Sequence, residues 1–181
     1  MIKIAKDPEL IAMFAFACAV LFCPGVQAAE TDATNLVVKL GFDQFPVENT
    51  CDGADVSPAI GVQGLIASSL AIIVDDMDAP SGTFTHWVIW NIPPTDVIPG
   101  RIAKSGTIAD PFPARQGTND FGEIGYAGPC PPSGKPHRYF FRAYGLDEML
   151  DLPAGATATD LRAAIEGHVL QKGEALASYG A

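Results

Sequence analysis

The sequence predicts a mainly-β fold, an antiparallel β-sandwich with a few peripheral helices, one of them near the C-terminus. Apolar runs rich in β-branched and aromatic residues, at Leu70–Val74, His86–Ile92 and Arg138–Leu146, have the length of buried strands. Glycine- and proline-rich segments separate these runs, as is typical of connections between strands. A helical pattern appears only in the tail. Strands therefore outnumber helices, which favours two packed sheets.

The remaining strand and loop candidates follow from the same patterns. Leu36–Leu40 is a short apolar strand, and the segment from Cys51 to Ile60 is rich in turn residues. The stretch 108–135 is glycine- and proline-rich and long. A compact domain rarely keeps such a length of chain without structure, so we expect it to be functional or internally packed.

The tail contains a predicted helix at Thr157–Glu166. Either Thr157 or Thr159 can cap its first turn. Leu161 and Ile165 lie one helical turn apart on an apolar stripe, which indicates a helix that packs against the domain. No regular structure is predicted after this helix.

Residues 1–28 have the order of a secretory signal peptide. A weakly basic start is followed by an uncharged apolar run from Leu10 to Phe22 and a small-residue stretch ending at Ala28. Cleavage there leaves residues 29–181, which have the length of a single domain. An uncleaved membrane anchor is the alternative, but the run is short for a span of about 20 residues. We expect a periplasmic or secreted protein.

The composition limits the class of partner. The chain carries a net charge of −10. Such a protein is poorly suited to binding nucleic acid through bulk charge, and a bound anion would need a local pocket. The sequence indicates no cofactor and no particular protein partner, and it does not support peripheral membrane contact.

Two of the four cysteines, Cys18 and Cys23, lie in the predicted signal peptide. Cys51 and Cys130 remain, and in an oxidising compartment a disulfide between them is the favoured interpretation. Two separate buried thiols are the alternative. Two cysteines are too few for a structural zinc site.

Two aspartates with the same parity follow a buried strand. In extended chain Asp76 and Asp78 point to the same side, so we expect them to share one space. Metal ligation, a turn or simple solvation could also explain this pattern. Asp75 is expected to face the other way and to be solvated.

Two of the three histidines begin strands beside turn-rich loops, where sites form. Alternation places His86 on the face of Val88 and Trp90. His137 and Tyr139 share a face, and Arg138 points to the opposite one, where a salt bridge is its expected role. A structural role remains open for each of these side chains.

Known catalytic motifs do not account for these residues. Two aspartates and two histidines could hold a metal. However, the sequence has no HExxH metalloprotease motif, no GxSxG nucleophile elbow and no nucleotide-binding glycine loop. Ser57, which precedes a proline, is interpreted as a turn residue, and His168 in the tail as a structural one.

Taken together, the ordered motifs resemble the phosphatidylethanolamine-binding family in its bacterial Raf-kinase-inhibitor-like branch. The matching stretches are Cys51-Asp52-Gly53 through Ser57-Pro58, Asp76-Met77-Asp78-Ala79-Pro80, His86-Trp87-Val88-Ile89-Trp90-Asn91-Ile92-Pro93, Gly117-Thr118-Asn119-Asp120-Phe121-Gly122, Gly125-Tyr126-Ala127-Gly128-Pro129-Cys130-Pro131-Pro132 and His137-Arg138-Tyr139. They cover most of the chain between Leu36 and Leu146.

The resemblance implies a β-sandwich with a small pocket for phosphate, phosphoryl groups or similar anions. The ligand-binding residues that it points to are Asp76, Asp78, His86, Gly128, His137 and Tyr139. It also implies a cis peptide bond at Ala79–Pro80.

The sequence thus predicts an exported anion-binding protein that catalyses no reaction, with a regulatory role left open. A phosphoester hydrolase using the aspartates and histidines is one alternative. A protein-interaction or inhibitor module is another. An anion beside two carboxylates requires protonated histidines or a protonated aspartate, so binding should strengthen as the pH falls.

Overall fold

Two β-sheets face each other across the main hydrophobic core of residues 34–180, which are the residues that the computed structural model describes. The predicted signal peptide, residues 1–28, lies outside them. The large sheet contains β1 (Thr34–Asn35), β4 (Ser69–Asp76), β5 (Phe84–Ile92), β7 (Thr107–Ile108), β8 (Ala114–Thr118), β9 (His137–Leu146), β10 (Gly155–Thr157) and β11 (Val169–Tyr179). The small sheet contains β2 (Val37–Lys39), β3 (Ile60–Gln63) and β6 (Val97–Ile98).

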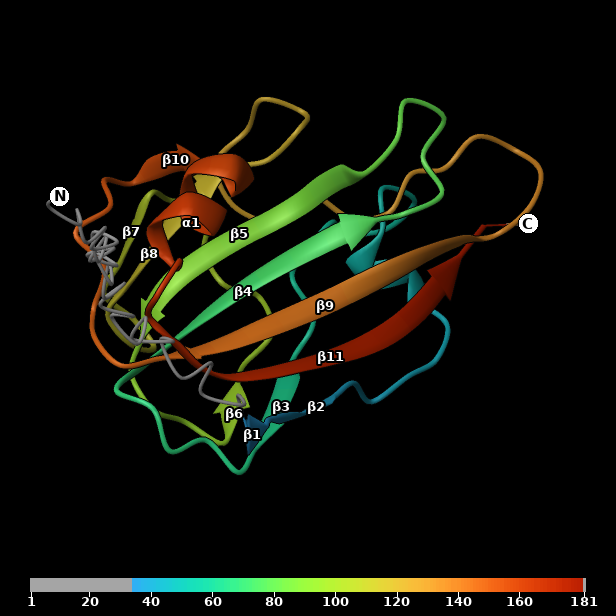
Figure 1. Ribbon diagram of the computed structural model, residues 1–181. Coiled ribbons are helices and arrows are strands. Elements are labelled where there is room, and N and C mark those ends of the chain that lie inside the picture. Colours follow the sequence, from blue (N-terminus) through green and yellow to red (C-terminus); the bar gives the residue numbers. More distant parts are fainter. Residues whose placement is uncertain (1–33, 181) are drawn as a thin grey trace, which may run out of the picture. The chain divides into compact units, whose positions relative to one another are not determined.

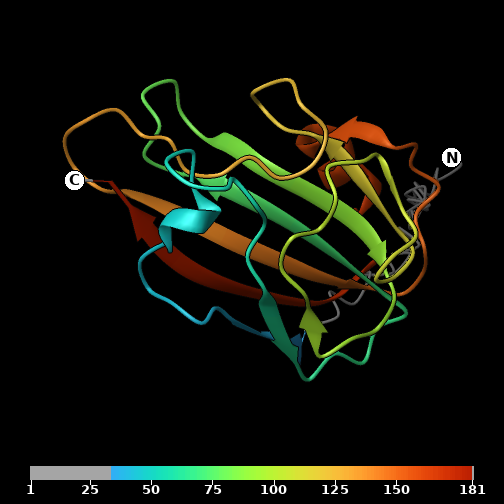
Figure 2. The ribbon, with the colours of Figure 1, turned by 180° about the vertical axis from the view of Figure 1, so that it is seen from behind.

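The large sheet has the strand order β1-β11-β9-β4-β5-β8-β10, with β7 paired to β8. Its long central strands are antiparallel and lie side by side in Figure 1. The short outer pairs β1–β11 and β8–β10 are parallel. Viewed from behind in Figure 2, the small sheet lies in front of the large one. The predicted mainly-β, antiparallel fold is confirmed.

Strand β4 separates two hydrophobic clusters. Ile72 and Val74 face the core between the sheets, while Ala71 and Ile73 face a second cluster that includes Leu161 of the helix. Because side chains alternate along a strand, burial of both faces makes every residue of β4 buried. This explains why the strand reads in sequence as a continuous apolar run.

The predicted tail helix is confirmed as α1 (Ala158–Ala164), which covers part of the outer face of the large sheet (Figure 1). Thr157 is its N-cap. The Thr157 hydroxyl accepts a hydrogen bond from the backbone N–H of Asp160, whose carboxylate accepts one from the backbone N–H of Thr157. This is a reciprocal capping box. The described residues contain one further helix, the short 3-10 helix η1 (Val47–Asn49).

Strand β11 is the element that sequence analysis missed. Exposed polar residues such as Lys172 and Glu174 alternate along it, and Gly173 interrupts it. These residue types have low β propensity, and no apolar run marks the strand. Gly173 is nevertheless required, because a Cβ there would lie 2.0 Å from the carbonyl oxygen of Leu36. The position accepts no side chain.

The stretch 108–135 is internally packed, as expected. It supplies strand β8 and the buried ring of Tyr126, whose hydroxyl donates to the carbonyl of Asn49 at 2.6 Å. Gln116 of β8 accepts a hydrogen bond from the buried indole N–H of Trp87 at 2.7 Å. Within residues 34–180, no helix has the length and hydropathy needed to cross a membrane.

Candidate ligand-binding cavity

A cavity of about 300 Å³ lies where β4 ends and β9 begins. The loop between β4 and β5 and the loop before β9 meet at this end of the large sheet (Figure 1). The cavity is lined by Asp76, Ala79, Pro80, Ser81, Phe84, His86, Phe121, Cys130, Pro131, Pro132 and His137. Three of the six predicted ligand-binding residues, Asp76, His86 and His137, are therefore brought together here.

Asp76 and His137 form a buried pair. Strand β4 places Asp76 opposite Tyr139 of β9, next to His137. The Nδ1 atom of His137 lies 2.7 Å from Oδ2 of Asp76. Because a carboxylate accepts hydrogen bonds, Nδ1 carries the proton. Nε2 is then free to accept a hydrogen bond, or to donate one once it is protonated.

His86 reaches the cavity because of a β-bulge. Val74 pairs with Trp87 and Asp75 pairs with Thr85, so His86 is an extra residue on β5. The bulge turns its ring toward Tyr139, with ring centroids 5.2 Å apart. The prediction that His86 shares a face with Val88 and Trp90 is thus wrong, since strict alternation breaks at the bulge.

The ring of His86 is held by the backbone of the following loop. Nδ1 donates to the carbonyl of Ala127 at 2.8 Å. Burial lowers the pKa of His86 below its ordinary value, and the hydrogen bond to Ala127 acts in the opposite direction. His86 is therefore neutral near neutral pH, with Nε2 as an acceptor.

Tyr139 packs against His86 but is not one of the residues that line the cavity. It shares the buried face of β9 with His137, which confirms the parity prediction. Its hydroxyl is buried and has no hydrogen-bond partner among the described residues. Burial, together with the nearby carboxylate of Asp76, raises the pKa of Tyr139.

Asp78 faces away from the cavity, so the predicted same-face pair with Asp76 does not form. The strand ends at Asp76, whose Oδ1 accepts from the backbone N–H of Asp78 at 2.8 Å and turns the chain. The Asp78 carboxylate accepts two hydrogen bonds from the Arg138 guanidinium, each 2.8 Å long. These bonds lower the pKa of Asp78 to about 2. The salt bridge predicted for Arg138 is confirmed.

Gly128 also lies outside the cavity lining. Its backbone N–H donates to Oδ1 of Asp55 at 2.6 Å. A Cβ at this position would lie 2.4 Å from the carbonyl oxygen of Asn49. The close approach that glycine permits is thus to the segment Asn49–Thr50.

The predicted disulfide joins Cys51 to Cys130, with Cα atoms 5.5 Å apart. The backbone N–H of Cys51 also donates to the carbonyl of Pro129 at 3.1 Å. Since Cys130, Pro131 and Pro132 line the cavity, the bridge anchors one of its walls.

The cis bond expected at Ala79–Pro80 is absent, and among the described residues the cis bond lies at Asp110–Pro111. Gly82 donates its backbone N–H to the carbonyl of Ala79 at 2.9 Å, which closes a four-residue turn. Pro80 is the second residue of this turn. That position suits the fixed φ of a trans proline, whereas cis proline belongs at the third.

Asp75 faces the opposite side of the sheet, as expected, but the prediction that it is solvated is wrong. Its carboxylate is fully buried. Oδ2 accepts hydrogen bonds from Arg142 and Arg162, each at 2.7 Å, and Oδ1 accepts one from Thr85 at 2.9 Å. Nothing in the local sequence marks these partners, which come from other elements.

Sequence analysis also missed the aromatic wall of the cavity. Phe84 and Phe121 both line it, with ring centroids 4.7 Å apart. A signal was present for Phe121, because a large apolar residue stands between Asp120 and Gly122 in an otherwise polar turn. Phe84 follows Thr83 at the start of β5 and carries no comparable signal.

Residues 34–180 contain no cluster of three or more histidine, cysteine, aspartate or glutamate side chains able to hold a metal ion. The titratable side chains of the cavity are Asp76 and two histidines, so the charge of the cavity depends mainly on whether the imidazole rings are protonated. The arrangement can donate hydrogen bonds from imidazolium groups to an anion, with the Asp76 carboxylate holding one ring in place.

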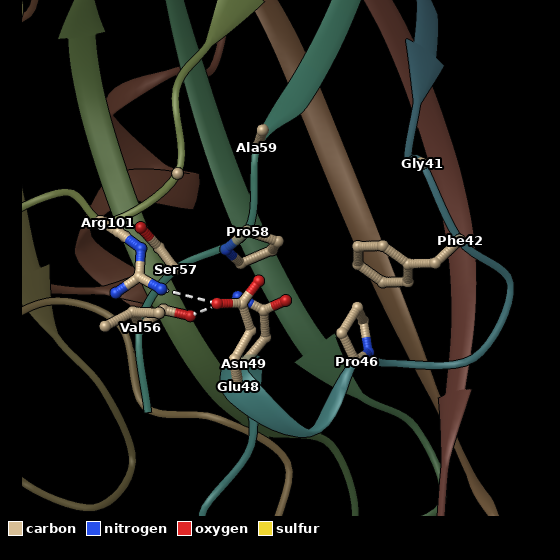
Figure 3. A pocket seen from close by; sticks show the side chains of 11 residues that line it. Gly41, Phe42, Pro46, Glu48, Asn49, Val56, Ser57, Pro58, Ala59 and Arg101 are labelled. Carbon is tan, nitrogen blue, oxygen red and sulfur yellow. Dashed lines mark hydrogen bonds and ion pairs between the residues drawn. The ribbon is translucent and has the colours of Figure 1, made fainter. Parts of the chain in front are cut away.

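A second cavity, of about 380 Å³, lies beside η1 and is shown in Figure 3. Nη2 of Arg101 lies 2.6 Å from Oε2 of Glu48 across it, and the side-chain amide of Asn49 donates to the carbonyl of Val56 at 2.8 Å. Ser57 accepts a hydrogen bond from the N–H of Ile102, which confirms its structural role. These polar groups bind one another, so the first cavity is the better candidate.

Comparison with known proteins agrees with this geometry. The profile of the phosphatidylethanolamine-binding protein family matches residues 39–180. The chain belongs to this family. A UPF0098 protein of Pyrococcus abyssi is 52% identical over 143 residues, which cover 77% of this chain and 80% of that protein. A UPF0098 protein of Aquifex aeolicus is 39% identical over 148 residues, covering 76% and 81% of the two chains.

Two solved structures of family members share the fold. A phosphatidylethanolamine-binding protein homologue from Chlamydia trachomatis superposes with a TM-score of 0.73 at 31% identity, covering 82% of this chain and 99% of its own. YbcL of Escherichia coli, described as a member of the mammalian family, gives a TM-score of 0.73 at 26% identity, with coverage of 82% and 99%. The family resemblance predicted from the motifs is confirmed.

Proposed function

We propose that this family member is an exported protein that binds a small anion, such as phosphate or a phosphoryl group, without catalysing a reaction. The observation that carries the proposal is the convergence of His86, His137 and Asp76 on one cavity of about 300 Å³. Asp76 orients His137 through a hydrogen bond of 2.7 Å. The two imidazoles supply donors to an anion once they are protonated.

The position of Asp78 supports anion binding. Two carboxylates facing one cavity would repel an anion. Instead Asp78 pairs with Arg138 outside the cavity, and Asp76 is the one carboxylate among the described residues that line it. The carboxylate of Asp76 is hydrogen-bonded to His137, so its negative charge is directed at that ring and not at the ligand.

The proposal makes anion binding depend on pH. Burial lowers the pKa of His86, so in the free protein its ring takes up a proton at a lower pH than an ordinary histidine does. A bound anion stabilises the imidazolium, and affinity therefore rises as the pH falls. We expect an increase of about ten-fold between about pH 8 and about pH 5.

Isothermal titration calorimetry with sulfate and with inorganic phosphate tests this. Sulfate keeps its charge over this range, whereas phosphate groups titrate near about pH 6. His137→Asn keeps a donor for Asp76 but removes the imidazole ring from the cavity, and it should weaken binding. His168→Asn is the matched control, because His168 pairs with Asp147 at 3.0 Å and does not line the cavity. Sulfate affinity that stays flat with pH would contradict the proposal.

A phosphoester hydrolase is the competing function. Ser81 offers a hydroxyl in the same cavity, yet among the described residues the Nδ1 atoms of His86 and His137 bond to Ala127 and Asp76 instead. Hydrolysis of p-nitrophenyl phosphate, measured with and without added divalent metal, distinguishes the two functions. Turnover that is lost in folded His137→Asn would show that the protein is an enzyme.

Export is part of the same proposal. It is supported by the signal-peptide pattern of residues 1–28 and by the disulfide, which persists in oxidising compartments. Cell fractionation followed by N-terminal sequencing checks it. The expected mature chain begins at Ala29, and a cytoplasmic protein that retains residues 1–28 would contradict the proposal.

A further inference from the structure

Hydrogen bonds fix the backbone of the turn that carries Phe121, a half-exposed residue that lines the cavity. Its relative exposure is 50%. Asn119 Oδ1 accepts the backbone N–H of Phe121 at 3.0 Å, and Gly122 donates to the carbonyl of Asn119 at 2.9 Å. Asp120 and Thr85 exchange two hydrogen bonds, of 2.6 and 2.9 Å, which fasten this turn to β5. Since Phe121 also lines the cavity, its half-exposed ring is available for contact with an apolar group of a ligand.

The ring of Phe121 belongs to a cluster of three aromatic rings, with Phe84 and His86, that lines the cavity. Its centroid lies 4.7 Å from that of Phe84 and 5.5 Å from that of His86, and Phe84 lies 5.3 Å from His86. All three pairs are edge-to-face. A further aromatic ring in the cavity could meet Phe121 in one of the offset or edge-to-face arrangements that aromatic rings prefer.

The cavity lining combines three buried polar side chains with a larger set of apolar ones. Asp76, His86 and His137 are the buried polar residues, and the apolar lining comes from Ala79, Pro80, Phe84, Phe121, Pro131 and Pro132. A volume of about 300 Å³ is within the range of sites for organic ligands, which are mostly apolar with a few placed polar groups. Inorganic phosphate alone would leave these walls without a partner.

From this arrangement we propose that the cavity selects organic phosphate monoesters with an aromatic substituent, whose ring packs against Phe121 and Phe84 while the phosphate meets His86 and His137. This rests on the proposed anion binding and names the ligand class of the same site. Phe121 is then a specificity-determining residue.

The experiment compares phenyl phosphate with methyl phosphate and cyclohexyl phosphate by calorimetry on the mature protein. We expect phenyl phosphate to bind about ten-fold more tightly than methyl phosphate, equivalent to about 1.4 kcal/mol. Cyclohexyl phosphate has the same number of carbon atoms but no aromatic ring. It should bind about three-fold more weakly than phenyl phosphate.

Variants assign the preference to the ring of Phe121. Phe121→Ala should reduce the preference for phenyl over methyl phosphate to about two-fold. Phe121→Leu keeps an apolar side chain and should reduce the difference between phenyl and cyclohexyl phosphate. Ile124→Ala is the control, because Ile124 is 39% exposed in the same loop and does not line the cavity. It should leave all affinities unchanged, and thermal unfolding verifies that each variant is folded.

The outcomes separate this proposal from the proposed function. Equal affinity for the three esters, or an unchanged preference in folded Phe121→Ala, overturns aromatic selection while anion binding stands. If neither inorganic phosphate nor any of the esters binds between about pH 5 and about pH 8, anion binding fails as well.

Discussion

Asp75 and Asp76 are neighbours on one strand, and both are buried, with exposures of 0% and 4%. Asp75 faces outward, where Arg142 and Arg162 hold one of its oxygens, while Asp76 faces the cavity and His137. Arginine stays charged at every accessible pH, whereas the charge of histidine changes near neutrality. Two residues of the same type thus have different surroundings. Asp75 belongs to a permanent ion-pair cluster on one face, and Asp76 belongs to a proton-dependent site on the other.

The immediate surroundings of Asp75 and Asp76 also differ in how completely their polar groups are satisfied. Around Asp75 both carboxylate oxygens have partners within the chain, including the hydroxyl of Thr85. On the cavity side the hydroxyl of Tyr139 is buried without a partner among the described residues. Buried polar groups without partners are rare in native structures and call for an explanation such as a ligand or an ordered water. Stability should therefore respond most to the first face, and binding to the second.

The largest effect is expected for Asp75→Asn. Removing this charge leaves Arg142 and Arg162 facing each other, and we expect a loss of about 3 kcal/mol in the free energy of unfolding. The arginine side chains are 26% and 41% exposed, which keeps the loss at the low end of the range for buried pairs. Urea unfolding measures it.

The control for this variant is Glu174→Gln. Oε2 of Glu174 lies 3.8 Å from Nε of Arg142, and the side chain is 60% exposed. A surface pair of this kind should contribute less than about 0.5 kcal/mol. Sulfate affinity should be unchanged in folded Asp75→Asn, and a large loss of affinity there would break the distinction between the two faces.

A smaller effect on stability and a larger one on binding are expected for Asp76→Asn. An amide keeps the shape and can still accept the hydrogen bond from His137, but it lacks the negative charge that stabilises the imidazolium. We expect a loss of about 1 kcal/mol in stability and a fall of about ten-fold in sulfate affinity below neutral pH. Calorimetry and urea unfolding on one preparation measure both quantities. An unchanged affinity would remove Asp76 from the site.

The smallest effect is expected for Asp78→Asn, and it disappears at acidic pH. Hydrogen bonds from Arg138 lower the pKa of Asp78 from 3.8 to about 2 in the folded protein. Because the folded-state pKa is depressed, this group stabilises the fold above about pH 4, and its contribution is lost as the pH falls toward about 2. The stabilities of wild type and variant should therefore converge on acidification.

Arg138→Gln removes the other partner of the same pair. It should reproduce the behaviour of Asp78→Asn, and the double variant should add nothing further. Thermal unfolding between about pH 2 and about pH 6 provides the comparison. A constant difference across this range would indicate that Asp78 acts through its backbone turn rather than through its charge.

The fold class was accessible from sequence because the long strands carry clear apolar patterns. Burial on both faces makes Leu70–Val74 of β4 a continuous apolar run, whereas Arg138–Leu146 of β9 is rich in aromatic residues and alternates in burial. The cap residue Thr157 marks the start of α1. Strand β11 was not accessible, because its alternation is weak and its pairing with β9 creates its regularity. Long-range partners, unlike local propensity, leave no mark within the strand itself.

The sequence by itself determined which side chains could meet: Asp76 at the end of one strand, and His137 and Tyr139 with one parity on another. Only the tertiary structure decided that a bulge turns His86 inward and that a turn after Asp76 sends Asp78 to Arg138. Alternation follows from the geometry of a single strand. Bulges, turns and ion-pair partners depend instead on the register between strands, which is established only when the core is packed.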